Sequence, residues 1–307
     1  MMITGVLAYT STFLLGLIVF LHFTWLFWKR KYSFLPHVPN IPWLGSIPYI
    51  GTTAVEFTRA CKSFSKKYGH VYVIWIGPYP VIRIGCADYA EVVLKSQETA
   101  RKSDSYFALK PVIGDGLILT HGKKWKLRRT ALTPSFHFSI LRDFSETFEV
   151  HCKRLVKVLQ ESVNEVIEVQ RLASLSTLDV ICATSMGVEL NALGSSGSDY
   201  VKSLRKTNDL VLLRTLNPFV VFDFVYRLTS NGKTFYEAVN VMHQFTTSVI
   251  NERIQKRKES RDEDRGEENA KKQRVLLDAL LDLYEEGVID VEGIQEEMNT
   301  FTFAGKV

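Results

Sequence analysis

The chain has 307 residues, of which 46% are apolar, enough for a packed core in one large domain or two small ones. Its net charge of +5 is mild and its lysines and arginines occur throughout, so we expect no nucleic-acid binding. The cysteines are Cys61, Cys86, Cys152 and Cys182; no CxxC or other metal-binding spacing joins them, and we expect small, buried, reduced side chains.

Residues 3–28 contain no Lys, Arg, Asp or Glu. At ~1.5 Å per residue this run makes a helix about 39 Å long, which can cross a hydrocarbon core of ~30 Å with some tilt. A cleaved signal peptide is the alternative, but no basic residue precedes the run, the run is too long, and no small-x-small cleavage site follows. Lys29-Arg30-Lys31 follows at once and marks the cytoplasmic side. We therefore predict a transmembrane signal-anchor at residues 1–28, with the N-terminus luminal and the remaining chain cytosolic.

A basic and proline-rich linker is predicted at residues 29–50. Pro36, Pro39 and Pro42 are spaced by three, which favours a stiff polyproline-type extension. Such a segment would act as a spacer between the anchor and the folded part of the chain.

Short elements are expected after the linker. Phe57–Tyr68 has the pattern of an amphipathic helix. Val71–Ile76 and Val81–Ile84 are β-rich runs around a Gly-Pro-Tyr-Pro sequence, which predicts a hairpin. Asp88 is expected to cap a helix that ends near Lys95.

The middle of the chain is predicted to become helical. Tyr106–Thr120 reads as irregular, and its Gly-x-Gly is only a partial dinucleotide-binding signature, which we discount. From Lys123 onward helices dominate, and Leu178–Gly187 indicates a buried one. Apolar residues at steps of three and four predict a helix with one core-facing stripe: Leu141, Phe144, Phe148, Cys152, Leu155 and Leu159.

The last third alternates between apolar and highly charged segments. Asn208–Leu228 is apolar, but charged residues and a proline interrupt it, so we predict two helix ends with an apolar connection instead of a second membrane span. Glu252–Arg274 is dense in charges of both signs and lacks aromatic residues, which predicts a solvated linker. Val275–Glu286 and Val291–Gly305 are expected to follow, the first as a helix.

The most informative stretch is His121–Phe144, where Trp125 lies four residues before Arg129. In a helix these positions are surface neighbours, and the two side chains offer only hydrogen-bond donors, which suits a dianionic ligand. A solvated basic face is the alternative, because this helix is rich in lysine and arginine. We expect Trp125 and Arg129 to point inward to an anionic cofactor edge. The outward side chains, which would suit an acidic electron-donor protein, are expected to be Lys124, Lys126 and Arg128.

Trp-x-x-x-Arg followed by Leu-Thr-Pro-Ser-Phe-His-Phe resembles the haem-propionate-binding helix of the haem-thiolate monooxygenases, the cytochrome P-450 superfamily. The longer phrase, the proline-rich stretch and Leu178–Gly187 are most similar to its family four, the fatty-acid hydroxylases. The resemblance covers nearly the whole chain. It implies a mainly α fold with a small β region, namely the N-terminal part of the P-450 fold in residues 51–307 behind a single transmembrane helix.

The resemblance also implies a function. The cofactor would be haem (heme b), and the full-length protein would insert oxygen from O2 into a fatty acid or similar lipophilic substrate. An NADPH-dependent reductase would supply electrons, and the location would be the endoplasmic reticulum membrane. The implied cofactor-binding residues are Trp125 and Arg129 at the propionates, and Ala304 and Gly305 at the start of the central oxygen-binding helix.

The same comparison exposes gaps. After Gly305, Lys306 and Val307 take the places of a variable and an acidic residue, and the family's threonine does not follow. Ala304 cannot form the covalent haem link that a glutamate makes in many family-four members. None of the four cysteines has the neighbours of the family's iron ligand, Phe-x-x-Gly-x-Arg-x-Cys-x-Gly. We therefore assign no catalytic residue and no metal ligand, and expect weak haem binding and no activity.

Two other hypotheses stay open. The chain could be a truncated, non-catalytic membrane protein that binds the reductase or dimer partners, as the anchor and the basic helix would allow. An unrelated helical lipid-binding protein would fit the apolar Asn208–Leu228 segment, but would leave the motif matches to coincidence.

Overall fold

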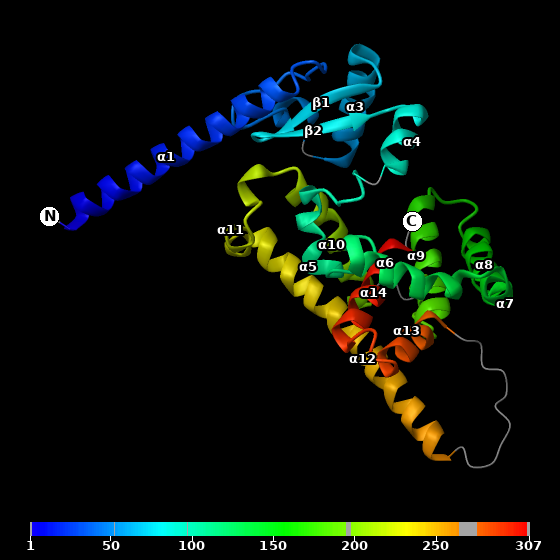
Figure 1. The fold of residues 1–307 in the computed structure, drawn as a ribbon. Coiled ribbons are helices and arrows are strands. Elements are labelled where there is room, and N and C mark those ends of the chain that lie inside the picture. Colours follow the sequence, from blue (N-terminus) through cyan, green and yellow to red (C-terminus); the bar gives the residue numbers. More distant parts are fainter. Residues whose placement is uncertain (1, 52, 97, 195–197, 264–274, 306–307) are drawn as a thin grey trace. The chain divides into compact units, whose positions relative to one another are not determined.

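The structure is a computed structural model that describes residues 2–51, 53–96, 98–194, 198–263 and 275–305. It is mainly helical with one two-stranded antiparallel sheet, as the sequence predicts (Figure 1). The chain divides into two compact units. The first holds residues 1–100 and 211–226, and the second holds residues 101–210 and 227–307.

The first unit is built around the sheet. Its elements are α1 (Met2–Lys31), α2 (Ile47–Ile50), α3 (Ala54–Tyr68), β1 (Val71–Ile76), β2 (Tyr79–Ile84), α4 (Ala87–Lys95) and the 3-10 turn η4 (Pro218–Val220). Helices α10 (Asp199–Thr215) and α11 (Asp223–Leu228) cross the boundary between the units and give the first unit residues 211–215 and 223–226. For Asn208–Leu228 the sequence predicts two helix ends joined by an apolar connection. This is confirmed, because α10 ends at Thr215, α11 begins at Asp223, and η4 lies between them.

The predicted hairpin is confirmed, with β2 starting two residues earlier than expected. Tyr79 pairs with Ile76 and Pro80 lies opposite Trp75, so only Gly77 and Pro78 remain in the turn. The four central residues of β1 are buried, and β2 is largely exposed. Tyr72 and Ile74 of β1 form a core with Val38, Ile50, Cys61 and Leu216.

Helix α3 confirms the predicted amphipathic helix and begins earlier, at a capping box in which Thr53 and Glu56 bond each other's backbone N–H. The helix after Asp88 is also confirmed as α4, but Asp88 does not cap it. Cys86 holds the cap position without a side-chain bond, and Asp88 lies in the first turn.

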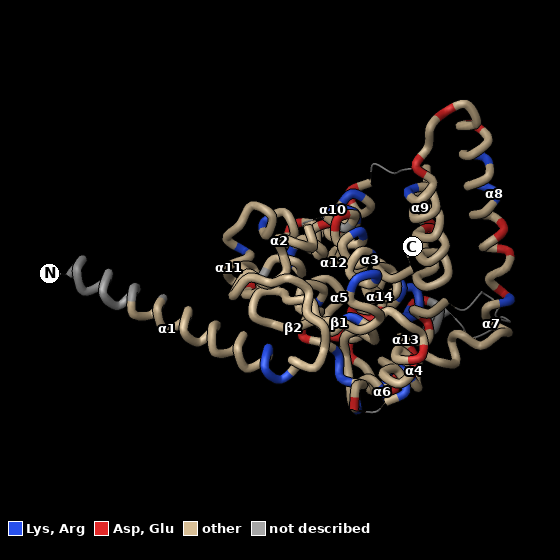
Figure 2. Tube along the Cα trace, turned by 90° about the horizontal axis from the view of Figure 1, so that it is seen from above, with Lys and Arg blue, Asp and Glu red and all other residues tan. Residues whose placement is uncertain are grey.

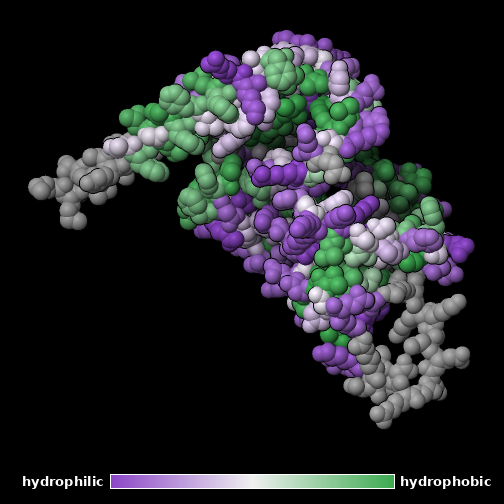
Figure 3. All heavy atoms as spheres, viewed as in Figure 1, coloured by the Kyte–Doolittle hydropathy of each residue, from purple (hydrophilic) through white to green (hydrophobic). Residues whose placement is uncertain are grey.

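The N-terminal apolar run forms α1, whose charged residues gather at its C-terminal end (Figure 2). Large apolar side chains cover much of its described surface (Figure 3). Phe20, Phe23 and Phe27 are exposed. Near its end Trp25 is buried against Val73 and Trp75 of β1. The transmembrane anchor predicted for residues 1–28 is not confirmed: among the described residues, no helix has both the length and the apolar content to span a bilayer.

The proline-rich segment is not the straight extension that its spacing predicts. Val38 donates to the Val73 carbonyl and Val73 donates to that of Pro36, so the segment pairs with β1. The chain then turns back between Ile41 and Gly45, a turn in which Trp43 has a φ of 67°. Backbone pairing with β1, which proline spacing does not encode, sets this path.

The second unit is almost entirely helical. Its elements are η1 (Asp104–Ala108), α5 (Lys110–Ile113), α6 (Gly122–Leu132), η2 (Thr133–Phe136), α7 (Phe138–Asp143), α8 (Ser145–Glu161), α9 (Val169–Ile181), the π-helical turn η3 (Cys182–Met186), α12 (Ser230–Glu263), α13 (Leu276–Glu285) and α14 (Val291–Ala304), with residues 199–210 of α10 and the end of α11. The core includes Leu132, Met186, Ile250, Leu277, Leu280, Ile294 and Met298. Helix α13 matches the predicted helix, and α14 gives the final segment its helical form.

The predicted linker at residues 252–274 is wrong for its first half, because α12 continues to Glu263. Arg253 donates through Nε and Nη2 to the Asp278 carboxylate at 2.8 and 2.6 Å, and Arg257 donates to Asp282 at 2.8 Å. Ion pairs to α13 therefore order a segment with few apolar contacts. Residues 264–274 lie outside the described residues.

The predicted helix with a stripe from Leu141 to Leu159 is broken at Phe144, between α7 and α8. Cys152 is exposed, whereas Cys61 and Cys182 are buried as predicted. Helix α8 carries charges of both signs along its length (Figure 2). The buried helix predicted at Leu178–Gly187 is confirmed as the end of α9 with η3.

Candidate functional site

Helix α6 holds the predicted donor pair. Its last residue, Leu132, is buried in the core of the second unit, which anchors the helix. Trp125 is 38% exposed and Arg129 is exposed as well. Four helical residues turn by about 400°, so the two side chains lie about 40° apart on one face. Within the described residues neither side chain has a hydrogen-bond or ion-pair partner.

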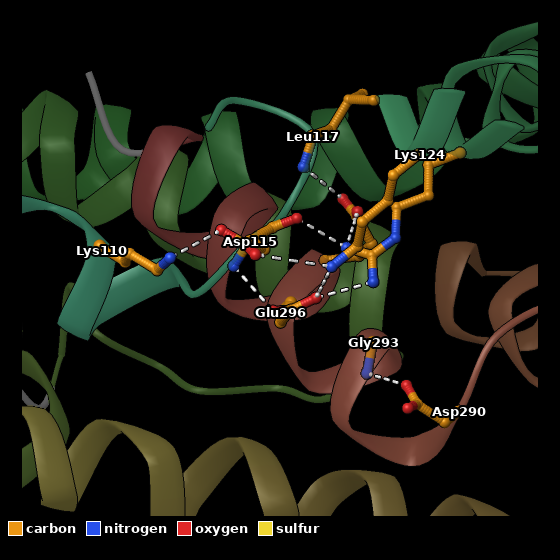
Figure 4. A network of polar contacts seen from close by, with 9 residues as sticks. Lys110, Asp115, Leu117, Lys124, Asp290, Gly293 and Glu296 are labelled. Atoms are coloured by element: carbon orange, nitrogen blue, oxygen red, sulfur yellow. Dashed lines mark hydrogen bonds and ion pairs between the residues drawn. The ribbon is translucent and has the colours of Figure 1, made fainter. Parts of the chain in front are cut away.

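Arg128 does not point outward, and that prediction was wrong. Its side chain is only 9% exposed. Nη1 donates to the Asp115 carbonyl at 2.8 Å and to Glu297 at 3.0 Å, and Nη2 donates to Glu296 at 2.7 Å. Lys124 also turns toward α14, with Nζ 3.4 Å from Glu296 (Figure 4). Of the three side chains expected to face outward, Lys126 alone is exposed without such an ion pair among the described residues.

The two glutamates of α14 complete a polar cluster that we call the α6–α14 junction: Asp115, Leu117, Lys124, Arg128, Glu296 and Glu297. The backbone N–H of Asp115 donates to Glu296 Oε1 at 2.7 Å, and that of Leu117 donates to Glu297 Oε2 at 3.1 Å. Each of the four carboxylate oxygens therefore accepts at least one hydrogen bond. Figure 4 shows the junction between α14 and the segment that precedes α6.

Glu297 is 0% exposed, and burial raises the pKa of its carboxyl group above the usual range. The Leu117 N–H and the Arg128 guanidinium act in the opposite direction, while the neighbouring Glu296 adds to the rise. A signal for this site was present in the sequence. Glu297 lies three residues after Ile294 and four before Phe301, on the apolar stripe of α14. A carboxylate at such a position needs a buried partner.

A cavity of about 620 Å³ lies at the far end of α14, lined there by Phe303 and the predicted site residue Ala304. Its apolar walls come from α5, α9, α10 and the segment before α6: Leu109, Ile113, Ile118, Leu175, Leu178, Val201 and Leu204. Its charged lining consists of two arginines and two acidic residues, Arg171, Arg205, Glu168 and Asp209. Gly305 packs on α9, where an added Cβ would lie 2.7 Å from Ile181 Cγ1. Trp125 and Arg129 are not among the lining residues.

The donor pair and the cysteines differ in what they could contribute to a cofactor site. Two adjacent donors without partners suit carboxylates such as the haem propionates, since Arg–carboxylate bonds are charge-assisted. Cys182 is not prepared as an iron-binding thiolate. For Cys182, burial first and then the charge of Asp179 raise the pKa of the thiol to about 12. No cluster of three metal-binding side chains occurs in the described part of the chain.

The helical fold with its small hairpin, together with the Trp-x-x-x-Arg helix, points to the haem-thiolate class of proteins. Residues 36–307 match the cytochrome P450 family, and the chain belongs to that family. The family predicted from the sequence is thereby confirmed.

Relatives that the chain matches include members of family four. "Cytochrome P450 4V2" of Mus musculus is 32% identical over 291 residues, covering 91% of this chain and 55% of the relative. "Probable cytochrome P450 4ac2" of Drosophila melanogaster is 34% identical over 261 residues, covering 84% and 50%. "Probable cytochrome P450 4ac3" of the same organism is 32% identical over 257 residues, covering 83% and 50%. The chain thus spans about half the length of these curated relatives.

Proposed function

We propose that this chain supplies the propionate-binding side of the haem and a substrate cavity in a family-four haem monooxygenase. The reaction would insert one oxygen atom from O2 into a fatty acid or similar lipophilic molecule, with electrons from an NADPH-dependent reductase. The observation that carries this proposal is the partnerless donor pair Trp125 and Arg129, on the helix whose motif matches the family.

In this proposal Trp125 and Arg129 bind the two propionates and fix the edge of the haem on α6. When bound, the haem supplies the oxygen activation. Ala304, which lines the cavity, and Gly305 beside it form the start of the oxygen-binding groove. A thiolate ligand to iron would have to come from a residue other than the four cysteines of this chain. We therefore propose that residues 1–307 alone are not catalytically competent.

The apolar walls of the cavity support a lipophilic substrate, and its charged lining offers two arginines, beside Glu168 and Asp209, for an acidic head group. Along α9, Arg171 precedes Leu178 by seven residues, which places it about 10 Å away along the helix axis. Ile181, which touches Gly305, lies one turn further on. Arg171 and Arg205 have no ion-pair partner within the described residues. A carboxylate at the arginines would leave its hydrocarbon chain directed toward Ala304.

Hemin titration of the purified chain in detergent tests the donor pair. We expect weak binding that Arg129→Ala lowers further, because the charge-assisted bond to a propionate is lost, while the exposed Lys126→Ala leaves it unchanged. Equal hemin affinity in both variants would contradict the assignment of Arg129. A thiolate-type spectrum of the reduced carbon monoxide complex would contradict the absence of an iron ligand among the four cysteines.

Docking of the reductase and location at the endoplasmic reticulum membrane remain predictions. The α6–α14 junction makes the predicted docking surface smaller, because Arg128 and Lys124 are engaged with Glu296. Lys123 and Lys126 remain exposed on α6 for such docking, whereas Arg129 is assigned to a propionate. The same reduction weakens the alternative of a non-catalytic protein that competes for the reductase.

A further inference from the structure

The segment between α5 and α6 lies directly against α14. At Gly116 an added Cβ would lie 2.0 Å from Thr300 Oγ1 and 2.8 Å from the Glu296 carbonyl oxygen. At Gly114, where φ is +59°, an added Cβ would lie 2.7 Å from Glu296 Cγ. Only glycine permits this close approach. The backbone N–H groups of Asp115 and Leu117 then reach the two carboxylates of the junction.

The same segment forms a wall of the cavity. Ile113 and Ile118, at either end of the bonded stretch, both line it. Phe303 and Ala304 line it from α14, and they follow Glu296 and Glu297 by seven residues. Residues seven apart lie on nearly the same helix face, about 10 Å along the axis. The junction and the cavity are therefore consecutive parts of one helix face, covered by one segment.

The composition of the junction favours a geometric role over a stabilising one. Desolvation offsets much of the attraction in a buried ion pair, and apolar side chains of similar volume often stabilise a protein as well or better. Hydrogen bonds from a planar guanidinium, however, fix direction as well as distance. Arg128 makes three such bonds, to α14 and to the Asp115 carbonyl, so it ties together three parts of the chain.

We propose that Arg128, Glu296 and Glu297 are positioning residues that hold residues 113–118 on α14 and thereby set the shape of the cavity and its affinity for an apolar chain. The choice of a fatty acid as the ligand rests on the proposed function. The positioning of the segment does not, because it follows from the contacts of the junction alone.

The test separates stability from positioning in the full chain. Arg128→Met/Glu297→Met replaces the buried pair by apolar side chains, and Glu297→Gln keeps an acceptor for the Leu117 N–H but removes the charge. Glu292→Gln is the control, because Glu292 is exposed on the same helix. The measurements are thermal unfolding, amide hydrogen exchange at Asp115 and Leu117, and binding of laurate and dodecanol by calorimetry.

We expect the double variant to unfold within a few degrees of the parent. Exchange at Asp115 and Leu117 should become about tenfold faster, and laurate and dodecanol affinity should both fall about tenfold. Glu297→Gln should also speed exchange at the two amides and lower the affinity for both ligands. This variant keeps the proposal testable if the double variant does not fold. Unchanged exchange in folded junction variants would overturn the proposal, as would unchanged ligand affinity. If the parent binds neither ligand, the proposed substrate class fails, and exchange at the two amides still decides the positioning role.

Discussion

Substitution of Gly116 by alanine should destabilise the second unit, because the new methyl group has no room. Its Cβ would lie 2.0 Å from Thr300 Oγ1 and 2.8 Å from the Glu296 carbonyl oxygen. Thr300 is only 2% exposed and Glu296 contributes backbone, so neither atom can move far. Overpacking of this kind costs ~1–3 kcal/mol. We place Gly116→Ala near the upper end, about 3 kcal/mol, because one of the two obstructing atoms belongs to a helix backbone.

Urea unfolding monitored by circular dichroism measures this cost, and Thr300→Ala provides the internal control. The Thr300 hydroxyl is buried without a hydrogen-bond partner among the described residues, so its removal alone sacrifices no such bond. In the double variant the hydroxyl clash disappears and the carbonyl clash remains, so about half of the Gly116→Ala cost should be recovered. A Gly116→Ala chain as stable as the parent would refute the close approach of this segment to α14. Strictly additive effects would refute the clash with Thr300.

The remaining predictions concern the α12–α13 ion pair and the cavity arginines. Burial alone would raise the pKa of Asp278, but the hydrogen bonds from Arg253 and Val275 N–H and the charge of Arg257 bring it below 3.8. The unfolded state therefore binds the proton more tightly, and the stabilisation is present above pH 3.8 and is lost as the pH falls through the folded-state pKa. Asp278→Asn should cost ~2–3 kcal/mol at neutral pH and flatten this acid dependence in pH-dependent urea unfolding; an unchanged profile would contradict the pairing. Arg205→Gln should weaken laurate binding about threefold to tenfold and leave dodecanol binding unchanged in calorimetry, because a charge-assisted bond is lost. An equal loss for both ligands would show that Arg205 shapes the cavity without contacting a carboxylate.

Local sequence patterns predicted the elements whose determinants are local. The hairpin follows from two β-rich runs around Gly77 and Pro78, and α13 follows from its apolar periodicity. The continuation of α12 to Glu263 could not be predicted in this way. Its residues are charged, and Arg253 finds its partner Asp278 only after the chain has folded back.

The two neighbouring arginines of α6 show a similar limit. A motif predicts that Arg129 binds a ligand, and its side chain is exposed and partnerless within the described residues. Nothing near Arg128 in the sequence indicates that it is buried. Arg128 is buried where it pairs with Glu296 and Glu297, which lie 168 and 169 positions later in the sequence. Long-range ion pairs thus bury Arg128, while its neighbour Arg129 stays exposed.

The α6–α14 junction recognises the segment before α6 through main-chain atoms. Glu296 and Glu297 accept from the backbone N–H groups of residues 115 and 117, and Arg128 donates to a backbone carbonyl. These bonds do not involve the side chains at positions 115 and 117, which make separate contacts: Asp115 pairs with Lys110 and Lys124, and Leu117 packs against the core. Evolution should constrain five residues jointly: Gly114, Gly116, Arg128, Glu296 and Glu297. The residues that line the neighbouring cavity can then vary while these five are retained together.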